Sequence, residues 1–324
     1  MKQRTLLWLV LPFLVALVSP ALAVGKTDQT HNQAVTLNNQ AAAAAESGRF
    51  EEAIALLKQA ITMQPDLAMA HYNLGHIYQA QGRFAQAIDA LNQATQLNSR
   101  FRDAHHNLGV TYNAMERYEE AIECFRRALS LEPDRADSLS ELGRAYLRLD
   151  RADEAVEVYK NLIRLKKDDP EAYNNLGVAC FKQGARGAAI EYLEQAIRLK
   201  PDSPEVHNNL GYAYSAMGQG KEAIASFQQA IALKPDNAEV LANLGMTYIS
   251  LGQYRQAAES LKKAIQLNPN LAEAHYNLAV LYLKQGERRL ALEQYNLLKL
   301  IDYEMSQKLI DVIYKDKILN VRAR

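Results

Sequence analysis

The sequence is poor in the residues that interrupt regular structure and in those that cross-link it. Its 324 residues include 15 glycines, 9 prolines and 2 cysteines. This low content of glycine and proline argues against long linkers and disordered segments. Cys124 and Cys180 are too few for a disulfide framework, a four-thiolate zinc site or an iron–sulfur cluster. Stability must therefore come from the packing of apolar side chains.

The chain also lacks a net charge, because its 37 basic and 37 acidic residues cancel. Affinity for nucleic acid depends on clustered Lys and Arg, so this balance argues against a nucleic-acid partner. The sequence contains no phosphate-binding glycine loop, no zinc-protease helix motif and no serine nucleophile elbow. We therefore expect a protein that is not an enzyme and that uses no cofactor, no metal and no small-molecule substrate.

Tryptophan is nearly absent, and the single one, Trp8, lies in an apolar N-terminal segment. Residues 1–23 combine two basic residues, an apolar run of about 13 residues and small residues up to Ala23, which is typical of a secretory signal peptide. The run is shorter than the roughly 20 residues that a membrane-spanning helix needs. We expect cleavage after Ala23 and a periplasmic or secreted protein. The alternative is an uncleaved anchor, which would be the only membrane contact.

A period of about 34 residues runs through the rest of the chain. Alanine and glycine mark it most strictly, at Ala53, Ala87, Ala121, Ala155, Ala189, Ala223, Ala257 and Ala291, and at Gly75, Gly109, Gly143, Gly177, Gly211 and Gly245. After a lead-in of residues 24–33, residues 34–305 divide into eight units: 34–67, 68–101, 102–135, 136–169, 170–203, 204–237, 238–271 and 272–305. Such internal repetition indicates a repeat architecture.

Each unit predicts two helices, because apolar residues occur at helical spacing in two runs with a short break between them. The repeated Gly and Ala fall where helix axes must pass within about 8–10 Å of each other. A proline after the second run, as at Pro65, ends that helix. Asp169-Pro170-Glu171 and Ser203-Pro204-Glu205 then supply an N-cap, a first-turn proline and an acid at the start of the next helix.

The residues His71-Tyr72-Asn73-Leu74-Gly75, followed by Tyr78, Ala87 and a closing proline, resemble the tetratricopeptide repeat family. The resemblance covers residues 34–305 and implies an all-α, right-handed superhelical solenoid of eight repeats of paired antiparallel helices. Residues 306–324 are amphipathic, and we expect them to form a C-terminal capping helix over the last apolar face. The alternative is a segment that docks a partner.

One polar position recurs two residues before the repeat glycine or its equivalent. It holds Asn39, Asn73, Asn107, Asn175, Asn209, Asn243 and Asn277, with Glu141 as the exception. An amide carries both a donor and an acceptor, so such a row can pair with the main chain of an extended peptide. The row is similar to the asparagine ladder that lines the superhelix of O-linked N-acetylglucosamine transferase in the same family. Alternatively, the amides bond neighbouring helices or cap local turns.

The resemblance places further side chains on the inner face, among them Tyr72, His76, His106, Tyr212 and Tyr276. Aromatic rings with polar tips suit partner binding, although they also pack between repeats. Chaperone-binding members of the family hold a C-terminal carboxylate with basic residues, but here the corresponding positions are Tyr72, His106, Ser140, Asn174 and Asn208. We therefore expect no carboxylate clamp. An acidic series from Asp103 to Glu273 opens the first helices, where it complements the helix dipole.

Some of the histidines could take part in binding a metal ion. His71, His105, His207 and His275 share one repeat position, which predicts core or half-core packing. His76 and His106 could meet Asp103 if adjacent repeats stack, which would give three metal ligands and a metal-dependent activity.

The sequence as a whole predicts an exported, non-enzymatic scaffold that binds an extended segment of a partner protein in a concave groove. The groove residues would be Asn73, Asn107, Asn175, Asn209, Asn243 and Asn277 with Tyr72, His106, Tyr212 and Tyr276. The alternative is a structural subunit of a bacterial envelope assembly, such as export or polysaccharide machinery, that packs against folded partners.

Overall fold

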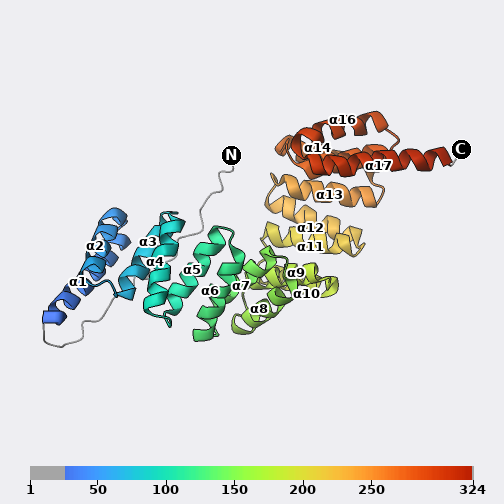
Figure 1. The fold of residues 1–324 in the computed structure, drawn as a ribbon. Coiled ribbons are helices and arrows are strands. Elements are labelled where there is room, and N and C mark those ends of the chain that lie inside the picture. The colour runs from blue at the N-terminus through green and yellow to red at the C-terminus, as the bar shows by residue number, and fades with distance from the viewer. Residues whose placement is uncertain (1–25, 323–324) are drawn as a thin grey trace. The chain divides into compact units, whose positions relative to one another are not determined.

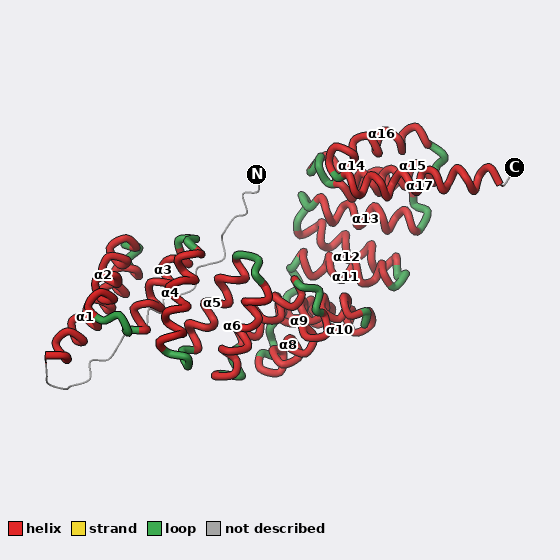
Figure 2. The backbone as a smooth tube through the Cα atoms, viewed as in Figure 1, coloured by secondary structure: helices red, strands yellow, loops and turns green. Residues whose placement is uncertain are grey.

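Residues 26–322 are described in a computed structural model, and their regular structure is entirely helical (Figures 1 and 2). The helices are α1 (Lys26–Glu46), α2 (Phe50–Met63), α3 (Ala68–Ala80), α4 (Phe84–Leu97), α5 (Arg102–Ala114), α6 (Tyr118–Leu131), α7 (Ala136–Arg148), α8 (Ala152–Leu165), α9 (Pro170–Gln183), α10 (Arg186–Leu199), α11 (Pro204–Ala216), α12 (Gly220–Leu233), α13 (Ala238–Ser250), α14 (Tyr254–Leu267), α15 (Ala272–Lys284), α16 (Arg288–Ile301) and α17 (Tyr303–Arg322). The expected signal peptide and its cleavage site at Ala23 lie outside the described residues. No helix in the described range is both long and apolar enough to cross a membrane.

Consecutive helices pack in pairs, α1 with α2 and so on to α15 with α16. We call the first helix of each pair helix A and the second helix B. The last residues of helices B, from Met63 of α2 to Ile301 of α16, recur at the constant interval of the sequence period, which confirms the predicted all-α repeat. Helix α1 begins at Lys26, so most of the lead-in expected at residues 24–33 is the first part of a helix A.

The chain forms two compact units, which divide between Lys166 and Lys167. Unit 1 contains α1–α8 and unit 2 contains α9–α17. Within each unit, helix A contacts helix A of the next repeat, whereas no two described helices B contact each other. Helices A therefore form the inner layer of each unit and helices B form the outer layer.

The repeated glycines and alanines allow the two helices of a repeat to approach closely. A Cβ added to Gly143 would lie 2.6 Å from Cζ of Tyr159, and one added to Gly177 would lie 2.7 Å from Cγ of Leu193. The alanines at Ala155 and Ala189 are fully buried at the same contact. These contacts confirm that small residues set the distance between the helices.

The turn between helices A and B requires a left-handed residue. Glycine fills this position in most repeats, for example Gly184 with φ of 91°. In unit 1 the same position is Glu116 in one repeat and Asp150 in the next, with φ of 60° and 58°. The left-handed region is unfavourable for residues that carry a Cβ, so two turns of unit 1 are strained.

The predicted helix starts of unit 2 are confirmed. The side chain of Asp169 accepts hydrogen bonds from the main-chain N–H groups of Glu171 and Ala172, and Ser203 accepts one from Val206. Asn237 caps α13 in the same way. Pro170 and Pro204 occupy the first helical positions, where a missing N–H has no cost.

The four histidines that share one repeat position bind the loop before helix A. Their Nε2 atoms lie 2.8–3.1 Å from the main-chain carbonyl oxygen six residues earlier, in His71, His105, His207 and His275. A carbonyl oxygen only accepts, so Nε2 carries the proton and donates it. Three of the rings are half-buried and His275 is buried, which confirms their prediction as core or half-core residues.

Helix α17 packs on both α15 and α16. Its Leu309 and Ile313 are fully buried in one cluster with Ala291 and Leu298 of α16. The helix thus covers apolar surface of the last helix pair, which is where a capping helix is expected.

Candidate partner-binding surface

The inner layer of unit 2 presents the same three-part stripe on successive helices A. On α11 the stripe consists of Glu205, Asn209 and Tyr212, at positions i, i+4 and i+7 of one helix face. On α13 the equivalent residues are Glu239, Asn243 and Met246, and on α15 they are Glu273, Asn277 and Val280. Because α13 contacts both α11 and α15, these stripes lie side by side as an acidic row, an amide row and an apolar row.

The apolar row contains large side chains that the fold leaves in solvent. Tyr212 is 46% exposed and Met246 is 37% exposed. Tyr212 also lies against Phe181 of α9, with ring centroids 5.1 Å apart. This part of the inner layer therefore offers aromatic and thioether surface beside the amides.

The asparagine row is used in part for contacts between repeats. Nδ2 of Asn209 donates to Oδ1 of Asn174 at 2.9 Å, and Nδ2 of Asn243 donates to Oδ1 of Asn208 at 3.3 Å. In unit 1, Asn73 donates to Asn38 at 2.8 Å. In these repeats the donor of the amide thus bonds the previous repeat, 35 residues earlier in the chain.

The amide oxygens differ between the units. Oδ1 of Asn73 is buried, with no hydrogen-bond partner among the described residues. Asn209, Asn243, Asn175 and Asn277 are partly exposed. In the described structure, Oδ1 of Asn175 accepts from Asn174, whereas the oxygens of Asn209 and Asn243 accept no hydrogen bond from a protein group. The open acceptors are therefore in unit 2.

Two of the predicted groove residues lie in the packing of unit 1. Tyr72 is buried against Phe101, with ring centroids 4.8 Å apart, and its hydroxyl accepts a hydrogen bond from Nδ2 of Asn107 at 3.2 Å. Burial raises the pKa of Tyr72 to about 12. His106 is buried beside Phe125. Of the four predicted ring residues, Tyr212 is exposed and Tyr276 is half-buried, and both belong to unit 2.

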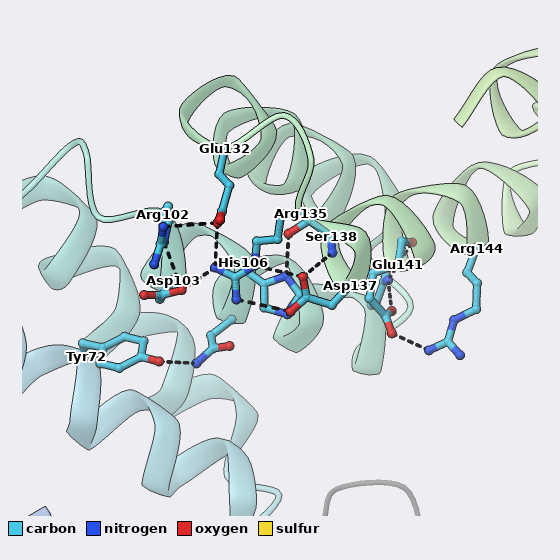
Figure 3. A network of polar contacts seen from close by, with 12 residues as sticks. Tyr72, Arg102, Asp103, His106, Glu132, Arg135, Asp137, Ser138, Glu141 and Arg144 are labelled. Carbon is cyan, nitrogen blue, oxygen red and sulfur yellow. Dashed lines mark hydrogen bonds and ion pairs between the residues drawn. The ribbon is translucent and has the colours of Figure 1, made fainter. Parts of the chain in front are cut away.

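A polar network in unit 1 ties consecutive repeats together around Arg135 (Figure 3). Arg135 precedes α7 and forms ion pairs with Asp103 of α5 and, at 3.0 Å, with Asp137 of α7. Its side chain is only 17% exposed. Nδ1 of His106 and the hydroxyl of Ser138 also form a hydrogen bond, at 2.8 Å. In unit 1 the acidic residues Asp103 and Asp137 are therefore paired with a cation of the protein itself.

The network shifts the protonation of its members. Burial lowers the pKa of His106 despite the nearby carboxylate of Asp137, so the neutral imidazole is favoured. Burial alone would raise the pKa of Asp137, but its hydrogen bonds with Arg135 and the neighbouring positive charge outweigh that effect and lower the pKa. The network therefore consists of a buried neutral ring and a charged ion pair that is open to solvent at Asp137.

The metal site that the sequence allowed does not form. The described residues include no group of three or more His, Cys, Asp or Glu side chains arranged to hold a metal ion. Asp103 pairs with Arg135, and His106 faces Ser138 and Asp137. His76, His106 and Asp103 thus do not converge as ligands.

Sequence reasoning missed two residues of this surface, Arg135 and Met246. Arg135 occupies the position that holds Asp169, Ser203 or Asn237 before other helices A. A basic residue at a position that otherwise caps a helix indicates a different contact, and this is visible in the sequence. Met246 lies one sequence period after Tyr212, in the same slot of the next repeat. Both could have been found by comparing the repeats position by position.

Helix pairs that recur at one constant period, with helices A inside and helices B outside, define an α-solenoid scaffold. Three family models match the chain: the cilia and flagella-associated protein 70 C-terminal domain over residues 14–234, a tetratricopeptide repeat over residues 216–259 and a TPR repeat over residues 245–286. The first covers more than half of the chain, and the chain belongs to this family of tetratricopeptide repeat domains. Comparison with curated proteins gives no match.

Two solved structures with TM-scores above 0.5 have the same fold. A chain of the APC/C hetero-tetramer Cut9–Hcn1 is similar over 89% of this chain and 56% of that chain, with 21% identity and a TM-score of 0.60. PilF of Pseudomonas aeruginosa is similar over 65% of this chain and 96% of its own, with 21% identity and a TM-score of 0.54. MamA matches 51% of this chain and 97% of its own, with 27% identity and a TM-score of 0.47. The family models make the chain a tetratricopeptide repeat scaffold, a class that generally mediates protein–protein interaction and is typically non-enzymatic.

Proposed function

We propose that this scaffold binds an extended segment of a partner protein along the inner layer of unit 2. The observation that carries the proposal is the exposed stripe of amide and apolar side chains on successive helices A, with Tyr212 and Met246 at its centre. Exposed aromatic and thioether groups are favoured in protein interfaces. Under this proposal the contact energy comes from the apolar row and the alignment of the segment comes from the amide row.

The hydrogen bonds of the amides suggest how the alignment works. Since Nδ2 of Asn209 and Asn243 already donates to the previous repeat, each side chain is held in one orientation. The oxygens then face outward as acceptors for main-chain N–H groups of the bound segment. A row that pairs with main-chain groups would select extended conformation more than side-chain sequence.

We further propose that the scaffold acts outside the cytoplasm, on the strength of the signal-peptide pattern in residues 1–23. Intact-mass measurement of the protein isolated from its own cells tests this. We expect a chain that begins at Val24. A mass that still includes Met1 would contradict cleavage.

The binding site can be tested with a photo-reactive phenylalanine analogue in place of Tyr212. We expect a covalent adduct with one partner protein in cells. The matched control carries the analogue at Lys262, which is exposed on α14 in the outer layer, and should give no adduct. Equal yields at the two positions, or none at Tyr212, would contradict binding on the inner layer.

The amide row needs variants that separate binding from folding. Changing Asn175, Asn209 and Asn243 to Ala should weaken binding by about 3 kcal/mol in total, or more than a hundredfold, at about 1 kcal/mol for each hydrogen bond. The control changes Asn174 and Asn208 to Ala, which removes the acceptors between repeats but keeps the row. Both variants break the two bonds between repeats and should lose similar stability, but the control keeps the amide oxygens of the row and should bind more tightly than the triple variant. Retained binding in the triple variant would show that the row is structural.

A second candidate is a fixed subunit of an envelope assembly that packs against folded proteins. It is favoured by Leu300 and Tyr303 near the C-terminal end of unit 2, which are 87% and 66% exposed. Exposed apolar residues that lie close together mark interaction surfaces. Changing both to Ser should abolish stable co-purification of a complex under this candidate. The same change should leave the adduct at Tyr212 intact if the inner layer is the binding site.

A further inference from the structure

We propose that the inner layer of unit 2 binds a segment that carries regularly spaced positive charges beside apolar side chains. This inference rests on the proposed function and specifies the chemistry of the partner. On α11, α13 and α15 an acidic row adjoins the exposed apolar row.

The carboxylates of this row are available to a partner. Glu205, Glu239 and Glu273 are exposed, and no ion pair joins any of them to another described residue. The equivalent acids of unit 1, Asp103 and Asp137, are engaged by Arg135. The same repeat position is thus neutralised in one unit and left charged in the other.

The residue before each helix explains the difference. Ser203 and Asn237 cap their own helices and carry no charge, so they leave the next glutamate without a cation. Arg135 occupies this place in unit 1 and reaches two carboxylates. The residues before these helices thus supply no cation to the acidic row, and Leu271 before α15, which makes no side-chain cap, supplies none either.

The acids do not stand alone, because each shares a helix face with an exposed or half-buried apolar group. Glu205 lies two turns from Tyr212, and Glu239 lies two turns from Met246. A segment that satisfies both rows must present cations on one side and apolar side chains next to them. An acidic segment would meet like charges along the whole row, which opposes binding.

The repeat spacing also suggests the form of the segment. Adjacent packed helices lie about 8–10 Å apart, so the carboxylates recur at about that interval. A polyproline II chain rises about 3.1 Å per residue with three residues per turn, which brings every third side chain to one side at about 9.3 Å. A lysine at every third position therefore matches one glutamate per repeat.

The probe for this inference is a fluorescent peptide of four Lys-Leu-Pro triplets, compared with a peptide of four Glu-Leu-Pro triplets. We expect the full-length chain to bind the lysine peptide and not the glutamate peptide. The variant that combines E205Q, E239Q and E273Q should bind the lysine peptide about tenfold more weakly, at a few tenths to 1 kcal/mol for each exposed charge pair. Added salt should reduce this difference.

The matched control combines E191Q, E222Q and E259Q, which changes the net charge equally on exposed positions of α10, α12 and α14. It should bind the lysine peptide as the unaltered chain does. Equal weakening by both triple variants, binding of the glutamate peptide, or no binding of the lysine peptide would overturn the inference. If the photo-reactive group at Tyr212 still captures a partner in that case, the proposed function stands. If it captures none, both are overturned.

Discussion

The two units use the same repeat but stabilise the start of helix A in different ways. In unit 2, Asp169, Ser203 and Asn237 satisfy main-chain N–H groups of their own helices. In unit 1 the equivalent Arg135 makes no cap and instead pairs with carboxylates of two successive helices A, Asp103 of α5 and Asp137 of α7. A local cap leaves the inner face charged and open, whereas a contact between repeats neutralises it. The residue before helix A thus determines whether the nearby carboxylates are open to a partner or hold the repeats together.

The turn between helices shows the same difference. In unit 1 an arginine follows the left-handed residue and stacks on a tyrosine of helix A, as Arg83 does on Tyr78 at 4.4 Å and Arg117 on Tyr112 at 4.6 Å. In unit 2 the equivalent residues are Ala185, Gln219, Gln253 and Glu287. Unit 1 therefore depends more on charged and cation–π contacts, which salt and pH affect, than unit 2 does.

The largest effect should come from what the units share. Ala189→Leu in unit 2 and Ala155→Leu in unit 1 place a large side chain where the helices of one repeat meet and the alanine is fully buried. Each should cost about 1–3 kcal/mol of unfolding free energy through overpacking, and the loss should extend to neighbouring repeats. Hydrogen exchange resolved by helix would measure it. A loss in one unit only would show that the close approach is not common to both.

The next effect should be confined to unit 1. Arg135→Met keeps the aliphatic stem but removes the ion pairs of Arg135 with Asp103 and Asp137, and we expect a loss of about 1–2 kcal/mol. Arg102→Met is the control, because Arg102 is half exposed and its ion pairs, with Glu132 at 3.3 Å and with Asp103 at 3.6 Å, are closer to solvent than those of Arg135. It should cost less than about 0.5 kcal/mol. Equal losses in urea titrations would show that Arg135 does not hold the repeats together.

The strained turns of unit 1 provide a test with the opposite sign. Glu116→Gly and Asp150→Gly should each stabilise the protein by about 1 kcal/mol, because glycine adopts the left-handed conformation without steric cost. The reciprocal change Gly184→Asp in unit 2 should destabilise by a similar amount. If thermal melting shows no gain in unit 1, then local contacts of these side chains compensate the strain.

The smallest effect is a dependence on pH in unit 1. Burial lowers the pKa of His106, so the folded protein keeps this ring neutral where the unfolded chain binds a proton. Stability contributed by neutral His106 is therefore present at neutral pH and falls as the pH drops through the ordinary value of about 6.5. His106→Gln should flatten this slope, measured by hydrogen exchange of α5–α7. His207→Gln in unit 2 should leave it unchanged, and an unchanged slope in the His106 variant would assign the effect to other groups.

Much of the fold was predictable because the repeat determines it locally. The recurring alanines and glycines, the caps at Asp169 and Ser203, and the half-buried histidine position are all visible as periodic residue types, and the structure confirms them. Each depends on contacts within one repeat or with its neighbour, which is the range over which a solenoid is organised.

The candidate surface was less predictable, because it depends on what the repeats do not share. Tyr72 and Tyr212 were both assigned to the inner face, but Phe101 covers the former and leaves it buried. The position of Tyr72 itself varies, from His106 and Ser140 to Asn174, so its environment changes with each neighbour. A single sequence predicts the shared framework well, whereas exposure of a given side chain depends on the residues one repeat away.

Each unit also contains one of the two cysteines, Cys124 in unit 1 and Cys180 in unit 2, and neither forms a disulfide. Burial raises the pKa of Cys124 to about 12, and Cys180 is buried. Alkylation requires the thiolate, so both sites react slowly until their helices open. The rate of labelling at each cysteine, read by mass spectrometry of the unmodified chain, therefore reports the opening of one unit independently of the other. The natural sequence thus carries a separate chemical probe of local unfolding in each half.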